Sequence, residues 1–417
     1  MRFHVIGLGS IGTLLSFHLR RALEPKHTIH LLHKSNGLAE TARKEGGHIG
    51  VEYNGVYLNE TGYKHEGFDP TARIYRELVK QGRAARTAIA GGEESKQVVE
   101  IPEVPESTTI ESLFVTTKAH AVYNVIEGLL PRLSPRCTIV LGVNGMGVYE
   151  ALVSTLFRNP ATRPHFILMS NTHGAWLKRH GHVVHSGPGN IQFGLVPDPR
   201  GRDFEGSMHP GGPLSSPHSR QHNLNDIALP QNDPHAAEYV SLRNTVYALL
   251  SMKDLKTTWL PMSELQVAMR KKLVANAVIN PLTALMNCRN GEVFRSDQGM
   301  DIMKKVCSEA GQVFSADIRS QPRGFEQPED AAPQGDPVPL ALKQAGLIKN
   351  CIGVAKQTAS NFSSMLLDVQ KGKETEIDYI NGYLVKLGNK YGVSMLTTST
   401  LAHLVKMRGQ VPPRPLM

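Results

Sequence analysis

The sequence predicts an α/β domain with a mostly parallel sheet, followed by an all-helical domain. In the first part of the chain, short β-branched and apolar runs alternate with helical patterns, and beyond about residue 236 helical periodicity dominates. The 417 residues are 40% hydrophobic and 20% charged, which is typical of globular proteins. A chain of this length can form two domains with separate cores.

The alternation of strands and helices begins with the first residues. Phe3, Val5 and Ile6 predict a strand, glycines follow, and Leu14 and Leu15 begin a helical pattern. Buried strands are predicted at residues 2–7, 28–33, 113–116 and 138–143, with a helix at 122–130. This pattern is typical of βαβ units.

Residues 1–260 are predicted to form the α/β domain and residues 261–417 the helical domain. Within the first domain, residues 166–194 predict a small antiparallel extension of the sheet. Helices are predicted at about 236–251, 262–288, 296–315, 340–358, 374–391 and 395–406. Three polar segments are predicted to be a peripheral insertion (62–108), a disordered surface loop (197–234) and a loop between helices (320–338).

The segment Gly7-Leu8-Gly9-Ser10-Ile11-Gly12 has the spacing G-x-G-x-x-G and lies directly between the first strand and helix. In this context Gly7 permits a tight turn, Gly9 lets backbone approach a pyrophosphate, and Gly12 lets the helix pack close to the strand. The helix N-terminus favours the anion. Glycine triplets elsewhere are usually turns, but this context predicts a Rossmann-type dinucleotide site. On the loop alone, FAD is an alternative ligand.

The end of the second strand predicts which nicotinamide cofactor is bound. NAD sites usually place Asp or Glu there, whereas this strand ends in His33-Lys34. Lys34, alone or with His33, can neutralise a 2′-phosphate, although a solvated loop lysine is an equally ordinary interpretation. Because the acid is missing, we predict NADP(H).

Composition and spacing argue against several other classes. A formal charge of +9 suits nucleic acid, anionic membranes or phosphorylated ligands, but the basic residues are scattered, so we expect no nucleic-acid partner. No apolar run reaches about 18 residues, so no membrane span is expected. The cysteines have no C-x-x-C pair, and no metal site or disulfide is predicted. The chain enters its first strand at once, which predicts a cytoplasmic protein, with the mitochondrion as the alternative.

The helical domain contains a row of polar residues in an apolar helix. Lys272, Asn276 and Asn280 are spaced at i, i+4 and i+8 and share one face of the predicted helix. Polar side chains in a buried helix need partners, so we expect this face to line a polar cavity. A lysine there can donate a proton to a carbonyl oxygen during hydride attack. The alternative is that Lys272 belongs to a basic surface patch with Arg270 and Lys271.

Two further segments add candidate groups. Asn361-Phe362-Ser363-Ser364-Met365 precedes a helical turn, and Glu374–Gly382 begins another helix. Hydroxyl and backbone N–H groups at a helix start suit a carboxylate. Taken separately, such serines usually cap helices, and such acids usually complement the helix dipole.

At these residues a family resemblance becomes specific. The blocks GLGSIG, FVTTKAHAV, VNGMG, NTHGA, KLVANAVINPLTALMNCRNG, NFSSMLLDV and TEIDYINGYLV occur in the order found in the ketopantoate reductase family. The chain resembles that family over both domains. The resemblance implies a helical domain of the 6-phosphogluconate-dehydrogenase-like type, with substrate in the cleft between the domains. The three polar segments, and a His-Lys pair where many members have Arg, depart from the family pattern.

The resemblance also implies roles for individual residues. Lys272 matches the catalytic proton donor. The positions that match substrate contacts are Lys272, Asn276, Asn280, Asn290 and Ser364. The positions implied to touch the cofactor, in addition to the glycine loop and Lys34, are Lys118, Asn144, Ala175 and Glu376.

The activity implied by the resemblance is the NADPH-dependent reduction of 2-dehydropantoate (ketopantoate) to (R)-pantoate, a step of pantothenate and coenzyme A biosynthesis. Its partners would be a small 2-oxo acid and, in a homodimer, a second copy; a monomer is the alternative. One rival is reduction of a different 2-oxo acid on the same fold. Another is a non-enzymatic RNA-binding or assembly factor, against which the intact glycine loop, Lys272 and Ser364 count.

Overall fold

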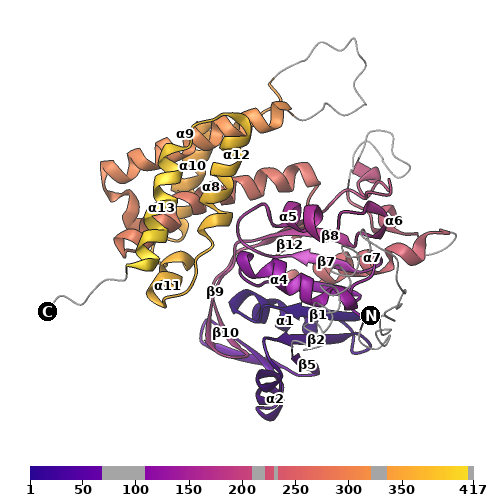
Figure 1. Cartoon of the computed structure of the whole chain (residues 1–417). Helices are drawn as coiled ribbons and strands as arrows, with labels where there is room; N and C mark the ends of the chain where they lie inside the picture. Colours follow the sequence, from indigo (N-terminus) through magenta and orange to yellow (C-terminus); the bar gives the residue numbers. More distant parts are fainter. Residues whose placement is uncertain (68–108, 209–220, 230–232, 321–335, 412–417) are drawn as a thin grey trace, which may run out of the picture. The chain divides into compact units, whose positions relative to one another are not determined.

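The computed structural model describes residues 1–67, 109–208, 221–229, 233–320 and 336–411 (Figure 1). The chain divides into two compact units. The first comprises Met1–Val143 and Tyr149–Met262, and the second comprises Asn144–Val148 and Ser263–Met417. The first unit carries the sheet and the second is helical, which confirms the predicted fold class. The short segment Asn144–Val148 belongs to the helical unit although it precedes the rest of that unit in the sequence.

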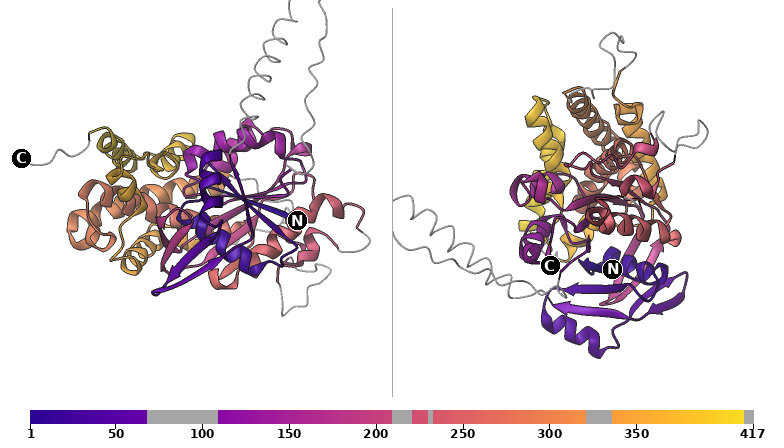
Figure 2. Two further views of the ribbon diagram at one scale, coloured as in Figure 1. Left: turned by 90° about the horizontal axis from the view of Figure 1, so that it is seen from below. Right: turned by 90° about the vertical axis from the view of Figure 1, so that its right-hand side faces the viewer.

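The main sheet of the first unit has its described strands in the order β12-β11-β8-β7-β6-β1-β2-β5. The four predicted strands are confirmed as β1 (Arg2–Ile6), β2 (Thr28–His33), β6 (Ser112–Val115) and β7 (Thr138–Leu141). Strand β1 pairs in parallel with both β2 and β6. The chain therefore reverses its direction of travel across the sheet between β1 and β6, where open α/β sheets bind ligands at the carboxyl ends of the strands. Figure 2 shows these indigo and magenta strands side by side.

The remaining elements of the first unit flank this sheet. Its other strands are β5 (Tyr63–Gly67), β8 (His165–Asn171), β11 (Ile191–Leu195) and β12 (Thr257–Trp259). Its helices are α1 (Ser10–Ala22), α2 (Asn36–Lys44), α4 (Ala119–Leu129), α5 (Val148–Thr155), α6 (Leu224–Ile227) and α7 (Ala236–Ser251). Short 3₁₀ turns are η3 (Leu130–Arg132), η4 (Pro160–Thr162), η5 (Gly206–Met208) and η6 (Lys253–Leu255). Helix α1 buries Leu14, Leu15 and Phe17 in a core shared with Val5 and Leu31.

A second sheet corrects the prediction for residues 166–194. It has the order β4-β3-β10-β9, formed by β3 (Ile49–Tyr53), β4 (Val56–Glu60), β9 (Gly174–Arg179) and β10 (His182–Gly187). Only β11 extends the main sheet in the antiparallel sense, through β8. The β9–β10 hairpin pairs instead with β3, a partner distant in sequence that local periodicity could not indicate.

Two predicted loops contain ordered structure. Tyr63–Gly67, which we predicted to begin an insertion, forms β5 and pairs with β2 at the sheet edge, where few apolar residues are needed. In the segment predicted to be disordered, Phe204 and Ile227 are buried in the core, and Arg202 binds Asp233 at 2.7 Å. The rest of these segments, at 68–108, 209–220 and 230–232, lies outside the described residues, as does 321–335 of the third loop.

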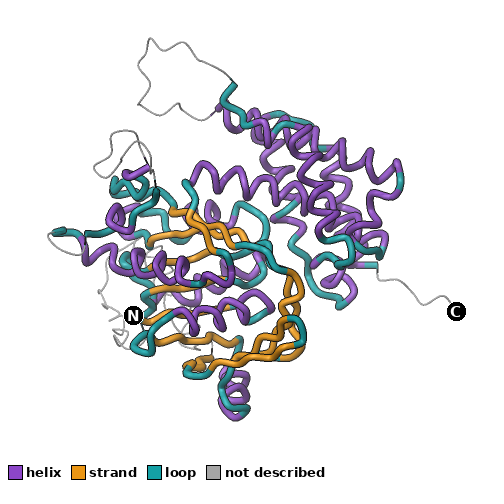
Figure 3. Tube along the Cα trace, turned by 180° about the vertical axis from the view of Figure 1, so that it is seen from behind, coloured by secondary structure: helices purple, strands orange, loops and turns teal. Residues whose placement is uncertain are grey.

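The second unit is built from helices alone over its described ranges (Figure 3). These are α8 (Met262–Met286), α9 (Asp297–Ser320), α10 (Gln344–Gln357), α11 (Ser364–Gln370), α12 (Asn381–Tyr391) and α13 (Leu396–Gln410). The 3₁₀ turns η7 (Asn290–Arg295), η8 (Leu340–Leu342) and η9 (Ile377–Tyr379) connect them. Its core joins α8 to α9 through residues such as Val274, Val278, Val306 and Phe314. Of the helices in the described ranges, none combines the length and apolarity needed to cross a membrane.

Helix α8 continues through a proline because a neighbouring side chain takes over a lost hydrogen bond. Pro281 has no N–H, so the carbonyl of Ala277 one turn earlier loses its usual donor. The buried Asn381 amide, at the start of α12, donates to this carbonyl at 3.0 Å. The helix can therefore continue past Pro281 to Met286.

Candidate active site

The glycine loop has the geometry that a dinucleotide requires. Gly7 has φ +93°, and a Cβ there would lie 2.4 Å from the backbone nitrogen of Thr117. A Cβ on Gly12 would lie 2.3 Å from the carbonyl oxygen of Gly7. At Gly9, by contrast, a Cβ would meet nothing closer than 3.9 Å, and this residue is exposed. The close backbone packing of the turn thus requires glycine at positions 7 and 12, whereas the outer side of the loop is open at Gly9.

The N-terminus of α1 is available to an anion. Its N-cap is Gly9, which has no side chain to satisfy the first N–H groups, and its first turn contains no acidic residue. Ser10 and Ile11 begin the helix, and Leu8 and Ile11 pack against the core below it. The positive end of the helix dipole therefore favours a phosphate at this point.

The neighbouring strand end adds further groups of the predicted site. Thr116 follows β6, and its hydroxyl contacts the carbonyls of Ile6 and Gly7 at 3.0 Å. Lys118 comes two residues later as the N-cap of α4 and is half-buried. Ala175 lies in β9 and packs partly buried against the core that also contacts Leu8.

At the end of β2, Lys34 is exposed and no acidic residue follows the strand directly. The expected contribution of charge from His33 is wrong. His65 donates from Nε2 to the carbonyl of Gly47 at 3.1 Å, so its Nδ1 accepts from His33 Nε2 at 3.0 Å. Burial, with smaller effects of His180 and His65, lowers the pKa of His33 to about 4. This imidazole is neutral at physiological pH, which leaves Lys34 as the cation at this strand end.

In the helical unit, three predicted residues meet in one hydrogen-bonded row. The Lys272 ammonium donates to Asn144 Oδ1 at 3.2 Å, and Asn144 Nδ2 donates to the Glu376 carboxylate at 3.2 Å. Glu376 is buried, with 4% of its surface exposed, and directly precedes η9. The Asn144 amide therefore contacts both charged groups, and these two contacts fix the orientation of the amide.

Close backbone packing brings Asn144 to this row. Met146 donates its N–H to the carbonyl of Tyr379 at 2.9 Å. Gly145 has φ +83°, and a Cβ there would lie 2.3 Å from the Tyr379 carbonyl oxygen. Only glycine permits this approach, which is why the VNGMG block docks Asn144 beside the Glu376 turn.

Burial changes the pKa of the Lys272 ammonium. Desolvation lowers its pKa to about 8, while the negative charge of Glu376 acts in the opposite direction. An amine with this pKa is still mostly protonated at pH 7 and yields its proton more readily than an exposed lysine. The arrangement can therefore supply a proton near neutrality.

The remaining predicted residues lie on α8 and on the segments that pack beside it. Asn276 is half-buried and Asn280 is buried on the Lys272 face of α8. Asn290 begins η7, where its Nδ2 donates to Thr358 at 3.0 Å and its backbone N–H to Asn361 at 3.0 Å. This contact joins Asn290 to the segment leading into α11.

The two serines of that segment have different positions. Ser363 is the N-cap of α11: it accepts from the N–H of Leu366 at 3.1 Å and from the Thr283 hydroxyl at 2.7 Å. Ser364 is the first residue of the helix and is exposed. The sequence did not indicate that Thr283 ties this cap to α8, three residues beyond Asn280.

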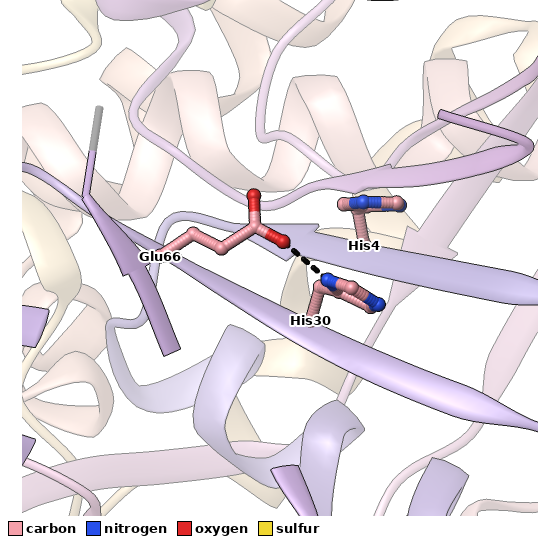
Figure 4. Close-up of side chains that lie close together, drawn as sticks. All are labelled: His4, His30 and Glu66. Atoms are coloured by element: carbon pink, nitrogen blue, oxygen red, sulfur yellow. Dashed lines mark hydrogen bonds and ion pairs between the residues drawn. The ribbon is translucent and has the colours of Figure 1, made fainter. Parts of the chain in front are cut away.

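One group among the described residues has the spacing of metal ligands. His4, His30 and Glu66 lie on neighbouring strands β1, β2 and β5, and one possible ligand atom of each lies within 4.8 Å of the others (Figure 4). However, Arg132 donates to Glu66 at 2.9 Å and lies 3.4 Å from His4 Nε2. Against the effect of burial, hydrogen bonding from His30 and the charge of Arg132 lower the pKa of Glu66 to about 2. The positive charge of Arg132 therefore compensates the negative charge of the Glu66 carboxylate.

A mostly parallel sheet with a glycine loop after its first strand, together with a helical unit that holds a half-buried lysine, is the arrangement expected of a two-domain dinucleotide-dependent oxidoreductase. The two sequence profiles described as ketopantoate reductase PanE/ApbA match residues 3–198 and, for its C-terminal part, residues 264–409. The chain therefore belongs to the ketopantoate reductase PanE/ApbA family, as the sequence blocks predicted.

Curated relatives extend over most of the chain. It is 28% identical to the 2-dehydropantoate 2-reductase of Yersinia pestis over 299 residues, which are 72% of this chain and 74% of that protein. It is 23% identical to the 2-dehydropantoate 2-reductase of Saccharomyces cerevisiae over 411 residues, 97% of this chain and 93% of the yeast protein.

Solved structures share the fold. A PanE/ApbA family ketopantoate reductase from Ralstonia eutropha superposes with a TM-score of 0.62 at 16% identity, covering 98% of this chain and 99% of that one. D-mandelate dehydrogenase, solved with NADH and anilino(oxo)acetate, superposes with a TM-score of 0.63 at 14% identity and 98% coverage of both chains. At these identities the likeness is one of fold.

Proposed function

We propose that this protein reduces ketopantoate to (R)-pantoate with NADPH, and that Lys272 donates the proton. The observation that carries the proposal is the row of Lys272, Asn144 and Glu376, in which burial lowers the pKa of the ammonium to about 8. Negative charge develops on a ketone oxygen as hydride reaches the carbonyl carbon. A positioned ammonium stabilises that charge and then transfers its proton.

Asn144 and Glu376 would prepare Lys272 for this step. The Asn144 amide orients the ammonium by accepting one of its three hydrogens. The Glu376 carboxylate favours the charged form of the lysine and so keeps the proton available at neutral pH.

The glycine loop and Lys34 support NADPH as the cofactor. The open side of Gly9 and the uncapped N-terminus of α1 fit a pyrophosphate. The absence of an acid directly after β2, and the exposed Lys34 in its place, fit a 2′-phosphate better than a free 2′-hydroxyl. The nicotinamide, when bound, supplies the hydride.

The amides and hydroxyl of the helical unit would hold the substrate. Asn276, Asn280, Asn290 and Ser364 offer neutral donors and acceptors that suit a carboxylate and a hydroxyl group. They would position the ketone rather than activate it. The names of the curated relatives favour ketopantoate. The shared fold with D-mandelate dehydrogenase makes an aryl-substituted 2-oxo acid the second candidate.

The test is the loss of NADPH absorbance with purified protein and three substrates: ketopantoate, its analogue without the 4-hydroxyl (3,3-dimethyl-2-oxobutanoate), and phenylglyoxylate. We expect ketopantoate to have the highest kcat/KM. Preference for phenylglyoxylate would change the substrate and keep the mechanism. NADPH binding with no turnover of any of the three would contradict the enzymatic proposal.

A lysine pair tests the cofactor choice. Lys34→Ala should raise the KM for NADPH and leave that for NADH unchanged, whereas Lys44→Ala, at the exposed end of α2, should alter neither. Equal effects of Lys34→Ala on both cofactors would contradict a contact with the 2′-phosphate.

A further inference from the structure

Helix α8 (Met262–Met286) has one turn that its own backbone does not complete. Pro281 lies inside the helix and has no N–H, so the carbonyl of Ala277, four residues earlier, lacks the donor that a regular helix supplies. Ala277 is wholly buried, with 0% of its surface exposed, so water cannot replace that donor. A carbonyl left in this state weakens the helix and allows it to bend at this turn.

Groups of the proposed site lie on both sides of this turn. Lys272, the proposed proton donor, precedes the turn, and Asn280 lies within it, directly before the proline. Thr283 follows the turn and donates from its hydroxyl to Ser363 at 2.7 Å, which ties α8 to the segment that carries Ser364. The geometry of this one turn therefore sets where Lys272 lies relative to the groups that would hold the substrate.

A buried asparagine from another helix completes the turn. Asn381, the first residue of α12, is 0% exposed, and its Nδ2 donates to the Ala277 carbonyl at 3.0 Å. Within the described residues its Oδ1 has no hydrogen-bond partner. Asn381 also ends the segment that begins with Glu376, whose carboxylate reaches Lys272 through Asn144. One short segment therefore acts on α8 at two places, through Asn144 at Lys272 and directly at Ala277.

We propose that Asn381 is a positioning residue for the reduction: its amide supplies the donor that Pro281 lacks and so fixes the Lys272 ammonium relative to the groups that hold the substrate. This inference rests on the proposed function. Asn381 lies in the core of the helical unit and acts through α8. Reacting groups must be closely aligned, since a misplacement of about 1 Å can cost roughly 100-fold in rate. Loss of the amide should therefore slow the chemical step more than it weakens binding.

The proline itself provides a rescue experiment. Pro281→Ala would restore an N–H four residues after Ala277, and alanine is the residue most favourable to a helix. In that background the backbone completes the turn, so the Asn381 amide is no longer needed there. A role of Asn381 in packing alone would not depend on whether the proline is present. The two explanations therefore predict different outcomes for the same double variant.

The proposal is tested by steady-state reduction of the preferred 2-oxo acid, expected to be ketopantoate, by the wild type, Asn381→Ala, Pro281→Ala and the double variant. Asn381→Ala should lower kcat about 10–100-fold, with a smaller change in KM. Its dissociation constant for NADPH should not change, because the glycine loop belongs to the first unit. Pro281→Ala should retain most of the wild-type kcat, and the double variant should have the same kcat as Pro281→Ala.

Asn350→Ala is the matched control. The Asn350 amide, on α10, donates at 3.0 Å to the carbonyl of Lys271, which also lies on α8. That carbonyl keeps the N–H of Ala275 as its regular helical donor, so loss of the Asn350 amide should leave kcat unchanged. Circular dichroism should show similar helix content in every protein. If Asn381→Ala does not fold, Asn381→Leu fills the same space without a donor and takes its place.

Recovery of kcat in the double variant would support the positioning role. If Asn381→Ala left kcat unchanged, the proposal would be overturned, even with a lower midpoint of thermal unfolding. An equal loss of kcat with and without Pro281→Ala would assign Asn381 a packing role and overturn the proposal as well. Failure of the wild type to reduce any of the three 2-oxo acids would instead contradict the proposed function, so the two failures are distinguishable.

Discussion

The two units differ sharply in the groups that titrate inside them. Of the 18 histidines, 17 fall in the sequence ranges of the first unit, and only His403 belongs to the helical unit. Within the first unit, burial lowers the pKa of His18, His33 and His165 to about 4. In the helical unit, Arg270 is instead paired with Asp317, and the lowered pKa near neutrality is that of Lys272.

We infer from this difference that acid affects mainly the first unit, whereas base affects mainly the helical unit. The first unit satisfies buried backbone and ring atoms with neutral imidazoles, such as His173, whose Nδ1 accepts from the backbone N–H of Gly189 at 2.9 Å. Protonation of such an imidazole in acid removes the ring nitrogen that accepts, and the contact is lost. The helical unit places its titratable chemistry on one lysine, which loses its proton as the pH rises. Its fold should therefore tolerate acid better, while its proposed chemistry should fail in base.

The largest expected effect concerns the glycine loop, in which Gly12 and Gly9 have different roles. Gly12→Ala places a methyl group 2.3 Å from the Gly7 carbonyl oxygen, so it should destabilise the first unit by about 1–3 kcal/mol and abolish measurable NADPH binding. Gly9→Ala meets open space, so it should leave stability unchanged and weaken NADPH binding about tenfold or more, equivalent to ~1.4 kcal/mol. Thermal unfolding and fluorescence titration with NADPH measure the two effects. Equal stability loss in both variants would contradict the assigned roles.

The second prediction concerns acid. A histidine whose folded pKa is lowered from 6.5 to about 4 contributes stability above pH 6.5 that is lost as the pH falls toward 4. Several such groups act together in the first unit. Both tryptophans, Trp176 and Trp259, also lie there, so tryptophan fluorescence follows that unit alone.

We expect the fluorescence to report unfolding between pH 6.5 and 4, ahead of the loss of ellipticity at 222 nm, to which the helical unit contributes strongly. Coincident transitions would contradict the proposed difference between the units.

The third prediction is a shift in a pH–rate profile. A proton donor must be protonated, so kcat/KM should fall above the pKa of Lys272, near 8. Glu376→Gln removes the charge that raises this pKa and should move the alkaline limb to lower pH. Glu374→Gln, at an exposed position nearby, is the control and should leave the limb in place. An unchanged limb in Glu376→Gln would mean that this carboxylate does not act on the lysine.

The smallest effect distinguishes two adjacent serines. Ser363→Ala removes the N-cap of α11 and should destabilise the helical unit by about 1 kcal/mol. Ser364→Ala alters an exposed side chain and should leave stability unchanged while raising the KM for ketopantoate. Chemical denaturation followed at 222 nm and steady-state kinetics give the two readings. The reverse pattern would show that the roles had been assigned to the wrong residues.

The sequence predicted the parts of the fold that depend on local pattern. Strand β2 and helix α7 have the predicted bounds, because apolar periodicity is strong in both. Strand β5 was missed because an edge strand needs little apolar sequence, and YKHEG resembles a polar loop. The partner of the β9–β10 hairpin was missed because pairing with β3 leaves no local signal.

The candidate site shows the same limit. Lys272, Asn276 and Asn280 could be placed on one face because helical spacing fixes their direction. The contact of Lys272 with Asn144 could not be derived from spacing, because it depends on Gly145 approaching Tyr379. The role of Asn381 could have been anticipated in part, since Pro281 within a helical pattern leaves one carbonyl without its donor.

The most direct test of the central claim is the single-turnover reduction of ketopantoate by Lys272→Ala, beside Lys271→Ala, with NADPH binding measured for both. Lys271 is the neighbouring, half-buried lysine and a matched control. We predict that Lys272→Ala binds NADPH as the wild type does and loses about 10²–10⁴-fold in rate, whereas Lys271→Ala retains its rate. Near-normal turnover by Lys272→Ala would contradict the assignment of the proton donor and, with it, the proposed mechanism.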